Sequence, residues 1–464
     1  MPRKEKTMRR MKTMVALAAA ASLVALAGCS GGGGGGTPAS GGAGGGEAVT
    51  LQYWLWDANQ TAQYQACADD FTKANPNIKI NITQSGWNDY WNNLTTNMVA
   101  GTAPDVFTDH LNYFPDFLDK KQIVDLQKYI DQDKVDLTQY YPGLADLWKD
   151  QNGDSYGLPK DWDTIAIFYN SDMVTKAGYT KDDMQKLTWN PTDGGTYEKL
   201  IAHLTVDQNG KRGDESGFDK TKVKTYGLAM EGDGAGFSQS QFSQYVFTTG
   251  WQFTDKNPWG TKYNFNDPRY KETVAWWKSL IDKGYMNNLE TSQSMDGNAL
   301  ESYGAGKFAM VTSGDWMMGS YLALKDVKTE FAPNPTGPSG KRASMFNGLT
   351  DAITTTSQHP DQAWQWVKYL GSTECQKHVA DAGVVFPAIK SLSDEVLSAR
   401  QAKGEDVTAF TVQVDDGTTF PPPITEHYPD VLALQQPVMD AILTGKSQVD
   451  ALDAVNDQIN ALFG

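Results

Sequence analysis

The chain has 464 residues, of which 40% are hydrophobic and 11% aromatic, so it can bury a sizeable core and is neither disordered nor fibrous. Residues 29–464 carry 34 basic and 55 acidic side chains, a net charge of −21. A surface this acidic repels phosphate backbones, which argues against nucleic-acid binding. The same residues hold four arginines, which disfavours a phosphorylated or other anionic ligand.

The first 28 residues are typical of an export signal. Six Lys and Arg side chains precede the apolar run 14–27, which is too short to span about 30 Å of hydrocarbon as a helix. The run ends in Leu26-Ala27-Gly28-Cys29, which resembles the lipobox of bacterial lipoproteins. The resemblance implies cleavage before Cys29 and lipid on its sulfur; the alternative is an ordinary signal peptide with a chance cysteine.

Residues 29–47 are predicted to be a flexible tether. The segment Ser30 to Glu47 contains 11 glycines together with Ser, Thr, Pro and Ala, and it cannot form a core. Its root-mean-square span would be roughly 23 Å. If the lipobox is modified with two or more acyl chains, the tether would hold a folded body at the extracytoplasmic face of the cell membrane.

Strands and helices alternate from residue 49 on. The pattern predicts strands over residues 49–56, 78–82 and 105–108, with helices over residues 61–74 and 88–100 between them. This order indicates an α/β domain with a parallel sheet. Ligands of such sheets bind beyond the carboxyl ends of the strands, so we expect a ligand near the polar residues that follow the first and third strands.

Several short motifs, in their order and spacing, resemble the extracellular solute-binding proteins of ABC sugar importers, the maltose-binding-like group. The resemblance runs from about residue 48 to the end of the chain. The motifs are Gly101-Thr102-Ala103-Pro104-Asp105-Val106, Tyr156-Gly157-Leu158-Pro159 followed by Phe168-Tyr169-Asn170, Gly306-Lys307-Phe308-Ala309-Met310 with Gly314-Asp315-Trp316, and the helix from Ala363 to Leu370.

The resemblance implies a two-lobe periplasmic-binding-protein-like fold of the α/β class, with a hinge and an interdomain ligand cleft. Lobe 1 would comprise residues 48–160 and 335–378, and lobe 2 residues 161–334 and 379–464. It further implies that the chain, as a monomer without a cofactor, captures a neutral di- or oligosaccharide between the lobes and delivers it to the transmembrane subunits of an ABC permease. Closure of a hinge around a ligand would signal to that permease.

Sugars offer hydroxyl groups and apolar C–H faces, so their sites combine flat aromatic rings with carboxylates and amides. Most of the 14 tryptophans and 55 acidic side chains are expected to pack in the core or lie on the surface, and only those at favourable positions are candidates. Of the five tryptophans in the list below, we expect two or three to stack on the ligand. The candidate ligand-binding residues are Trp56, Asp57, Trp87, Asp109, His110, Asp161, Trp162, Asp163, Glu231, Trp251, Trp316, Asn347 and Asp351.

Two cysteines remain beside Cys29. Cys67 shares a helical stripe with Tyr64 and Phe71, so its side chain is expected to face the core. In an oxidising compartment Cys67 and Cys375 could form a disulfide, or both could be buried thiols, and the sequence leaves both possibilities open.

The rival class of protein is a secreted carbohydrate-active hydrolase that uses a pair of carboxylates. Asp161 and Asp163, two residues apart on a strand-like segment, could share one face and form such a pair. No nucleophile elbow or zinc-protease motif occurs in the sequence, so no catalytic residue is assigned. The segment 207–211 begins like a calcium loop but has a lysine at a ligand position and lacks the required glycine, so no metal site is expected.

Overall fold

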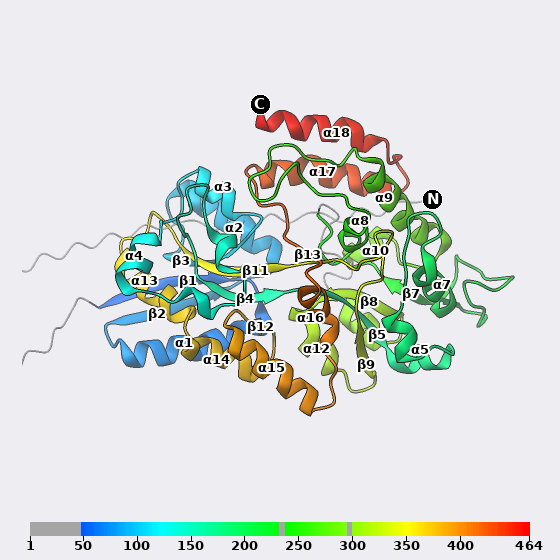
Figure 1. Cartoon of the computed structure of the whole chain (residues 1–464), viewed down its shortest axis with the longest axis horizontal. Coiled ribbons are helices and arrows are strands. Elements are labelled where there is room, and N and C mark those ends of the chain that lie inside the picture. Colours follow the sequence, from blue (N-terminus) through cyan, green and yellow to red (C-terminus); the bar gives the residue numbers. More distant parts are fainter. Residues whose placement is uncertain (1–47, 232–236, 295–298) are drawn as a thin grey trace, which may run out of the picture. The chain divides into compact units, whose positions relative to one another are not determined.

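The structure is a computed structural model that describes residues 48–231, 237–294 and 299–464 (Figure 1). The export signal, Cys29 and the whole tether lie outside these residues. Within the described residues, no helix combines the length and the apolar character that crossing a membrane requires.

The first sheet has six strands in the order β12-β4-β11-β3-β1-β2. Strands β1, β2 and β3 run parallel to one another, and β11 pairs antiparallel with both β3 and β4. The predicted strand–helix alternation at the start of this domain is confirmed. The bounds are β1 (Val49–Leu55), β2 (Ile78–Gln84), β3 (Val106–His110), β4 (Pro159–Asp163), β11 (Asn347–Ile353) and β12 (Phe386–Pro387).

Seven helices of the described residues accompany the first sheet. Helix α1 packs beside α14, and α14 packs beside α15, so these three lie side by side in Figure 1. The bounds are α1 (Thr61–Ala74), α2 (Trp87–Ala100), α3 (Phe114–Asp119), α4 (Gln127–Asp133), α13 (Pro360–Leu370), α14 (Thr373–Ala382) and α15 (Lys390–Ala402).

The second sheet has five strands in the order β6-β7-β8-β5-β9. Every residue of its two central strands β5 and β8 is buried, as expected for strands covered on both faces. The bounds are β5 (Ile165–Asn170), β6 (Val206–Asp207), β7 (Val223–Ala229), β8 (Phe308–Gly314) and β9 (Thr329–Ala332).

Eleven further helices of the described residues follow β5 or accompany the second sheet. The bounds are α5 (Ser171–Lys176), α6 (Lys181–Gln185), α7 (Gly195–Leu204), α8 (Ser243–Phe247), α9 (Pro268–Lys283), α10 (Leu289–Ser294), α11 (Ala299–Gly304), α12 (Met318–Leu322), α16 (Thr408–Asp415), α17 (Tyr428–Leu443) and α18 (Ala451–Asn460).

The chain passes between the two sheets at two places that matter for the site. Strand β4 leads into β5 with Thr164 alone between them. Phe346 separates β11 from β10 (Ser344–Met345), which pairs with β13 (Thr419–Phe420). Residues 161–163 and 386–387, which the expected boundaries give to lobe 2, therefore pair in the first sheet. The remaining lobe boundaries stay a prediction.

Helix α1 shows how the sequence pattern sets the packing. Its buried residues Tyr64, Cys67, Ala68 and Phe71 recur on one stripe and cover the first sheet, as predicted. Cys67 forms a disulfide with Cys375 of α14, which decides between the two possibilities that the sequence leaves open.

Candidate functional site

Three strands of the first sheet bring polar residues to one edge. Strand β3 ends at His110, β4 ends at Asp163, and the antiparallel β11 begins at Asn347. Asn347 is the ladder partner of Asp163. The amide nitrogen of Asn347 lies 3.2 Å from Asp163 Oδ2 and 2.9 Å from His110 Nε2. Three of the candidate residues therefore lie together, and their contact with a ligand stays a prediction.

Trp56, which follows β1, joins this edge to an aromatic cluster. Its ring centroid lies 5.0 Å from that of Trp87 and 5.4 Å from that of Trp91, and Trp87 lies 5.5 Å from His110. Trp56 is half-buried, and Trp87 has 40% of its surface exposed. Two of the predicted stacking residues therefore keep accessible surface beside the polar edge.

Trp316 follows β8 of the second sheet and is half-buried. A Cβ atom at Gly314 would overlap the ring of Trp316, so the indole lies back over the glycine. The glycine has φ −89° and ψ 164°, which is ordinary extended backbone. Gly314 therefore makes room for the indole, whereas the sequence suggested that it allows a turn.

Two predicted stacking residues lie in the core instead. Trp162 is 0% exposed, stacks on Phe386 with 4.7 Å between centroids, and donates to Ser393 Oγ at 2.8 Å. Its side chain points away from those of Asp161 and Asp163 because successive side chains of a strand alternate between faces. Trp251 is 1% exposed and stacks on Tyr270 with 4.8 Å between centroids.

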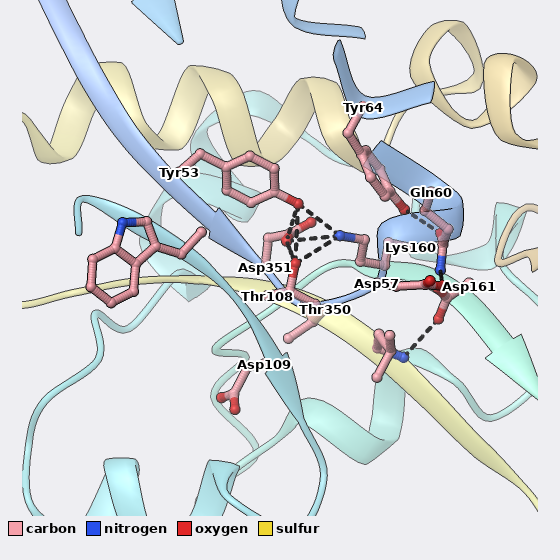
Figure 2. Close-up of polar contacts among 12 residues, drawn as sticks. Tyr53, Asp57, Gln60, Tyr64, Thr108, Asp109, Lys160, Asp161, Thr350 and Asp351 are labelled. Carbon is pink, nitrogen blue, oxygen red and sulfur yellow. Dashed lines mark hydrogen bonds and ion pairs between the residues drawn. The ribbon is translucent and has the colours of Figure 1, made fainter. Parts of the chain in front are cut away.

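Asp351 lies on β11 of the first sheet, in a network drawn in Figure 2. Its Oδ1 forms an ion pair with Lys160 Nζ at 3.0 Å and accepts hydrogen bonds from Tyr53 (2.8 Å) and Thr108 (2.9 Å). Lys160 also lies 4.0 Å from the centroid of the Tyr64 ring. Core partners thus occupy Oδ1 of Asp351, while Oδ2 is buried without a hydrogen-bond partner among the described residues. The burial of this ion pair does not favour the predicted contact with a ligand.

The remaining polar candidates differ in how far local partners satisfy them. Asp57 caps the 3-10 turn at residues 58–60, accepting from Asn59 N and Gln60 Nε2 at 2.8 and 2.9 Å. Asp109 accepts from the backbone of His110 at 2.8 Å. Glu231 accepts from Ser313 Oγ at 3.3 Å, which places it beside β8.

Burial controls the charge at this edge. It lowers the pKa of His110 to about 3, so the imidazole is neutral at physiological pH. It raises the pKa of Asp161 to about 7, against the opposing effect of Lys160, and raises the pKa of Asp109 and Asp163 well above the usual range. For Asp163 the neighbouring charge of Asp161 acts in the same direction.

Sequence analysis missed one residue of this region as a candidate. Asp315 follows Gly314 at the end of β8, is 0% exposed, and has both carboxylate oxygens without a hydrogen-bond partner in the described part of the chain. Its backbone nitrogen donates to Thr164 O at 3.2 Å, beside Asp163. The sequence did contain a signal, an acidic residue soon after the apolar run Phe308 to Val311, but the adjacent tryptophan was chosen instead.

A separate pocket of about 420 Å³ lies near the second connection between the sheets. Tyr141, Phe346, Lys390 and Asp415 are among its lining residues, and none of the predicted site residues lines it. No group of three or more His, Cys, Asp or Glu residues within the described ranges could hold a metal ion.

The sequence profile described as bacterial extracellular solute-binding protein matches residues 66–408. The chain belongs to this family. The resemblance inferred from its motifs is thereby confirmed, and the solute-binding role comes with the family. The family also indicates an extracytoplasmic location for this solute-binding protein.

Two relatives and one solved structure illustrate the similarity. The solute-binding protein is 25% identical over 317 residues to the maltodextrin-binding protein MdxE of Bacillus subtilis, covering 66% of each chain. It is 25% identical over 321 residues to a maltooligosaccharide ABC transporter solute-binding lipoprotein of Streptococcus pneumoniae, covering 67% of this chain and 66% of the relative. The substrate-binding protein Lmo0181 of Listeria monocytogenes, solved with cycloalternan, has a TM-score of 0.75 at 20% identity, covering 89% and 98% of the two chains. This last likeness supports the two-lobe fold.

Proposed function

We propose that this solute-binding protein captures an oligosaccharide at the junction of its two sheets and delivers it to an ABC permease. The observation that carries the proposal is the combination of partly accessible indoles with buried polar groups. Trp56, Trp87 and Trp316 offer flat apolar faces, while Asp163 and Asn347 offer an acceptor and an amide. Sugar rings present the complementary C–H faces and hydroxyl groups.

The names of the relatives support the same class of ligand and the same kind of partner. MdxE is named for maltodextrin, and the pneumococcal relative is named for maltooligosaccharide and for an ABC transporter. A receptor of this kind transmits occupancy when the permease prefers its closed form, because a ligand shifts an equilibrium by its differential affinity for the two states. The hydrolase alternative has no specific observation in its favour.

We also propose that lipid on Cys29 anchors the protein at the extracytoplasmic face of the cell membrane. The apolar run before Leu26-Ala27-Gly28-Cys29 and the glycine-rich tether after it support this step. The pneumococcal relative is named a lipoprotein. In the same proposal the tether leaves the folded body free to reorient toward the permease.

A thermal-shift screen over di- and oligosaccharides tests the sugar proposal. A ligand present at 100 times its Kd stabilises the folded state by about 2.7 kcal/mol, which raises the melting temperature measurably. Chromatography of each sugar after incubation is the control for catalysis. Stabilisation by at least one sugar that is recovered intact supports a receptor; release of shorter products contradicts it and supports a hydrolase.

A further inference from the structure

Asp163 and Asp315 are neighbours at the first connection between the sheets. Asp163 is the last residue of β4, and Asp315 directly follows β8. Gly314 is the ladder partner of Ile165, and Asp315 N donates to Thr164 O at 3.2 Å. The two carboxylates therefore belong to different sheets but flank the same backbone connection.

Within residues 48–231, 237–294 and 299–464, neither carboxylate forms an ion pair with a cation. Asp163 is 8% exposed and accepts from Gln239 Nε2 at 2.8 Å and Asn347 Nδ2 at 3.2 Å, both uncharged donors. Asp315 is 0% exposed, and both its oxygens lack a partner in the part of the chain that the structure describes. The nearest cation on β4, Lys160, forms its ion pair with Asp351. A buried carboxylate without donors is costly, so such a residue is expected where a ligand supplies them.

We propose that the bound sugar carries a protonated amino group and that Asp163 and Asp315 together hold it. This inference rests on the proposed function and deepens it by naming the substrate class. The scarcity of arginine and the net charge of −21 argue against an anionic ligand, but both are compatible with a cationic one. The expectation of a neutral sugar thus applies to the rest of the ligand and not to the group that Asp163 and Asp315 hold.

The chemistry of the donors favours an ammonium group over a hydroxyl group. An ammonium has three N–H donors and a positive charge, so one nitrogen can donate to both carboxylates and let both ionise. A hydroxyl group has one O–H donor and no charge, so it would leave two ionised carboxylates without a positive charge between them. A hard metal ion needs six or more oxygen ligands, and two amide N–H groups already point at Asp163.

Matched sugars test the proposal by titration calorimetry at pH 6. The probes are a glucosamine trimer, its N-acetylated form and cellotriose, which share one linkage and differ at the 2-position, together with trehalosamine and trehalose. We expect an amino sugar of at least one series to bind at least tenfold more tightly than its uncharged counterparts. Asp315→Asn and Asp163→Asn should each abolish that preference. Asp315→Asn should change the affinity for the uncharged sugar less than twofold, whereas Asp163→Asn also alters an acceptor of the proposed sugar site.

Asp182→Asn is the matched control, because it removes one charge from a carboxylate that is 71% exposed. It should leave the preference intact, and melting curves should show that all three variants fold. Uncharged sugars that bind as tightly as their amino counterparts overturn the inference and leave the proposed function standing. A preference that survives in both Asp163→Asn and Asp315→Asn also overturns it. Absence of binding by every sugar contradicts both proposals.

Discussion

Lys160 and Asp351 form a fully buried ion pair across the neighbouring strands β4 and β11, with 3.0 Å between Nζ and Oδ1. Tyr53 of β1 and Thr108 of β3 accept further hydrogen bonds from Lys160 Nζ, at 2.8 and 3.0 Å. The network therefore spans four adjacent strands of the first sheet. Since β4 and β11 are also the strands that lead to the second sheet, the same pair fixes the position from which both connections start.

The first prediction concerns this pair. Lys160→Met leaves the Asp351 carboxylate buried without its cation, so we expect the free energy of unfolding to fall by about 3–5 kcal/mol. Urea unfolding followed by tryptophan fluorescence measures the loss. The double variant Lys160→Met with Asp351→Leu removes both charges and should recover much of it. A loss below about 1 kcal/mol in the single variant would show that the pair does not stabilise the sheet.

The second prediction concerns the disulfide between α1 and α14. Cys67 and Cys375 are 308 residues apart in sequence, so the bridge closes a long loop of the unfolded chain. Its removal in Cys67→Ser with Cys375→Ser should cost about 2–5 kcal/mol of stability. Melting of the wild-type protein with and without reductant measures the same effect. If the double variant melts like the oxidised wild type, the bridge has no stabilising role.

The third prediction uses the pKa of Asp161. Burial raises this pKa from 3.8 to about 7 in the folded state, so between these values the folded state holds a proton that the unfolded state has lost. The contribution of Asp161 to the free energy of unfolding is therefore fully present only below pH 3.8. It is lost as the pH rises from there through about 7, with a slope of up to about 1.4 kcal/mol per pH unit.

Asp161→Asn removes this titration and can still accept from Leu349 N, as Asp161 Oδ1 does at 3.1 Å. We therefore expect the melting temperature of the variant, relative to wild type, to be higher at pH 8 than at pH 4.5. A difference between the two proteins that stays constant across this range would contradict the raised pKa.

The fourth prediction concerns the half-buried indole beside Gly314. Trp316→Ala should weaken sugar binding at least tenfold, a loss of about 1.4 kcal/mol or more. Trp251→Phe is the control, because Trp251 is packed in the core. It should lower the melting temperature and leave the affinity unchanged. Unchanged affinity in Trp316→Ala together with a sharply lowered melting temperature would show that Trp316 has a packing role.

The fifth prediction concerns the membrane anchor. Cys29→Ser should release the protein from the membrane fraction, because lipid on this residue is the proposed anchor. Fractionation and immunoblotting of the wild type and the variant measure the release. Continued membrane association of the variant would contradict the lipoprotein proposal.

Local patterns were enough to predict the start of the fold. The alternation of Ile78, Ile80 and Ile82 and the stripe on α1 each match the structure, because burial on one face imposes these periods directly. The meeting of Asp163 with Asn347 was predicted only as part of a candidate set. Their pairing depends on the order of strands separated by 184 residues, which no local pattern encodes.

The tryptophans show where sequence reasoning fails. Trp162 lies between two acidic residues, and this neighbourhood suggested a site, but strand alternation turns its side chain into the core. Asp351 was a candidate near Gly348, and the partner of its Oδ1, Lys160, lies 191 residues away. Tertiary neighbours decide both roles, so composition and spacing alone could not.

Titration calorimetry with the sugar selected by the thermal-shift screen tests the central claim most directly, provided that the sugar is recovered and examined afterwards. The account predicts saturable binding of one sugar per chain, weakened at least tenfold by Trp316→Ala, with the sugar recovered intact. Absence of binding to every oligosaccharide tested, or conversion of the sugar into shorter products, would contradict the account.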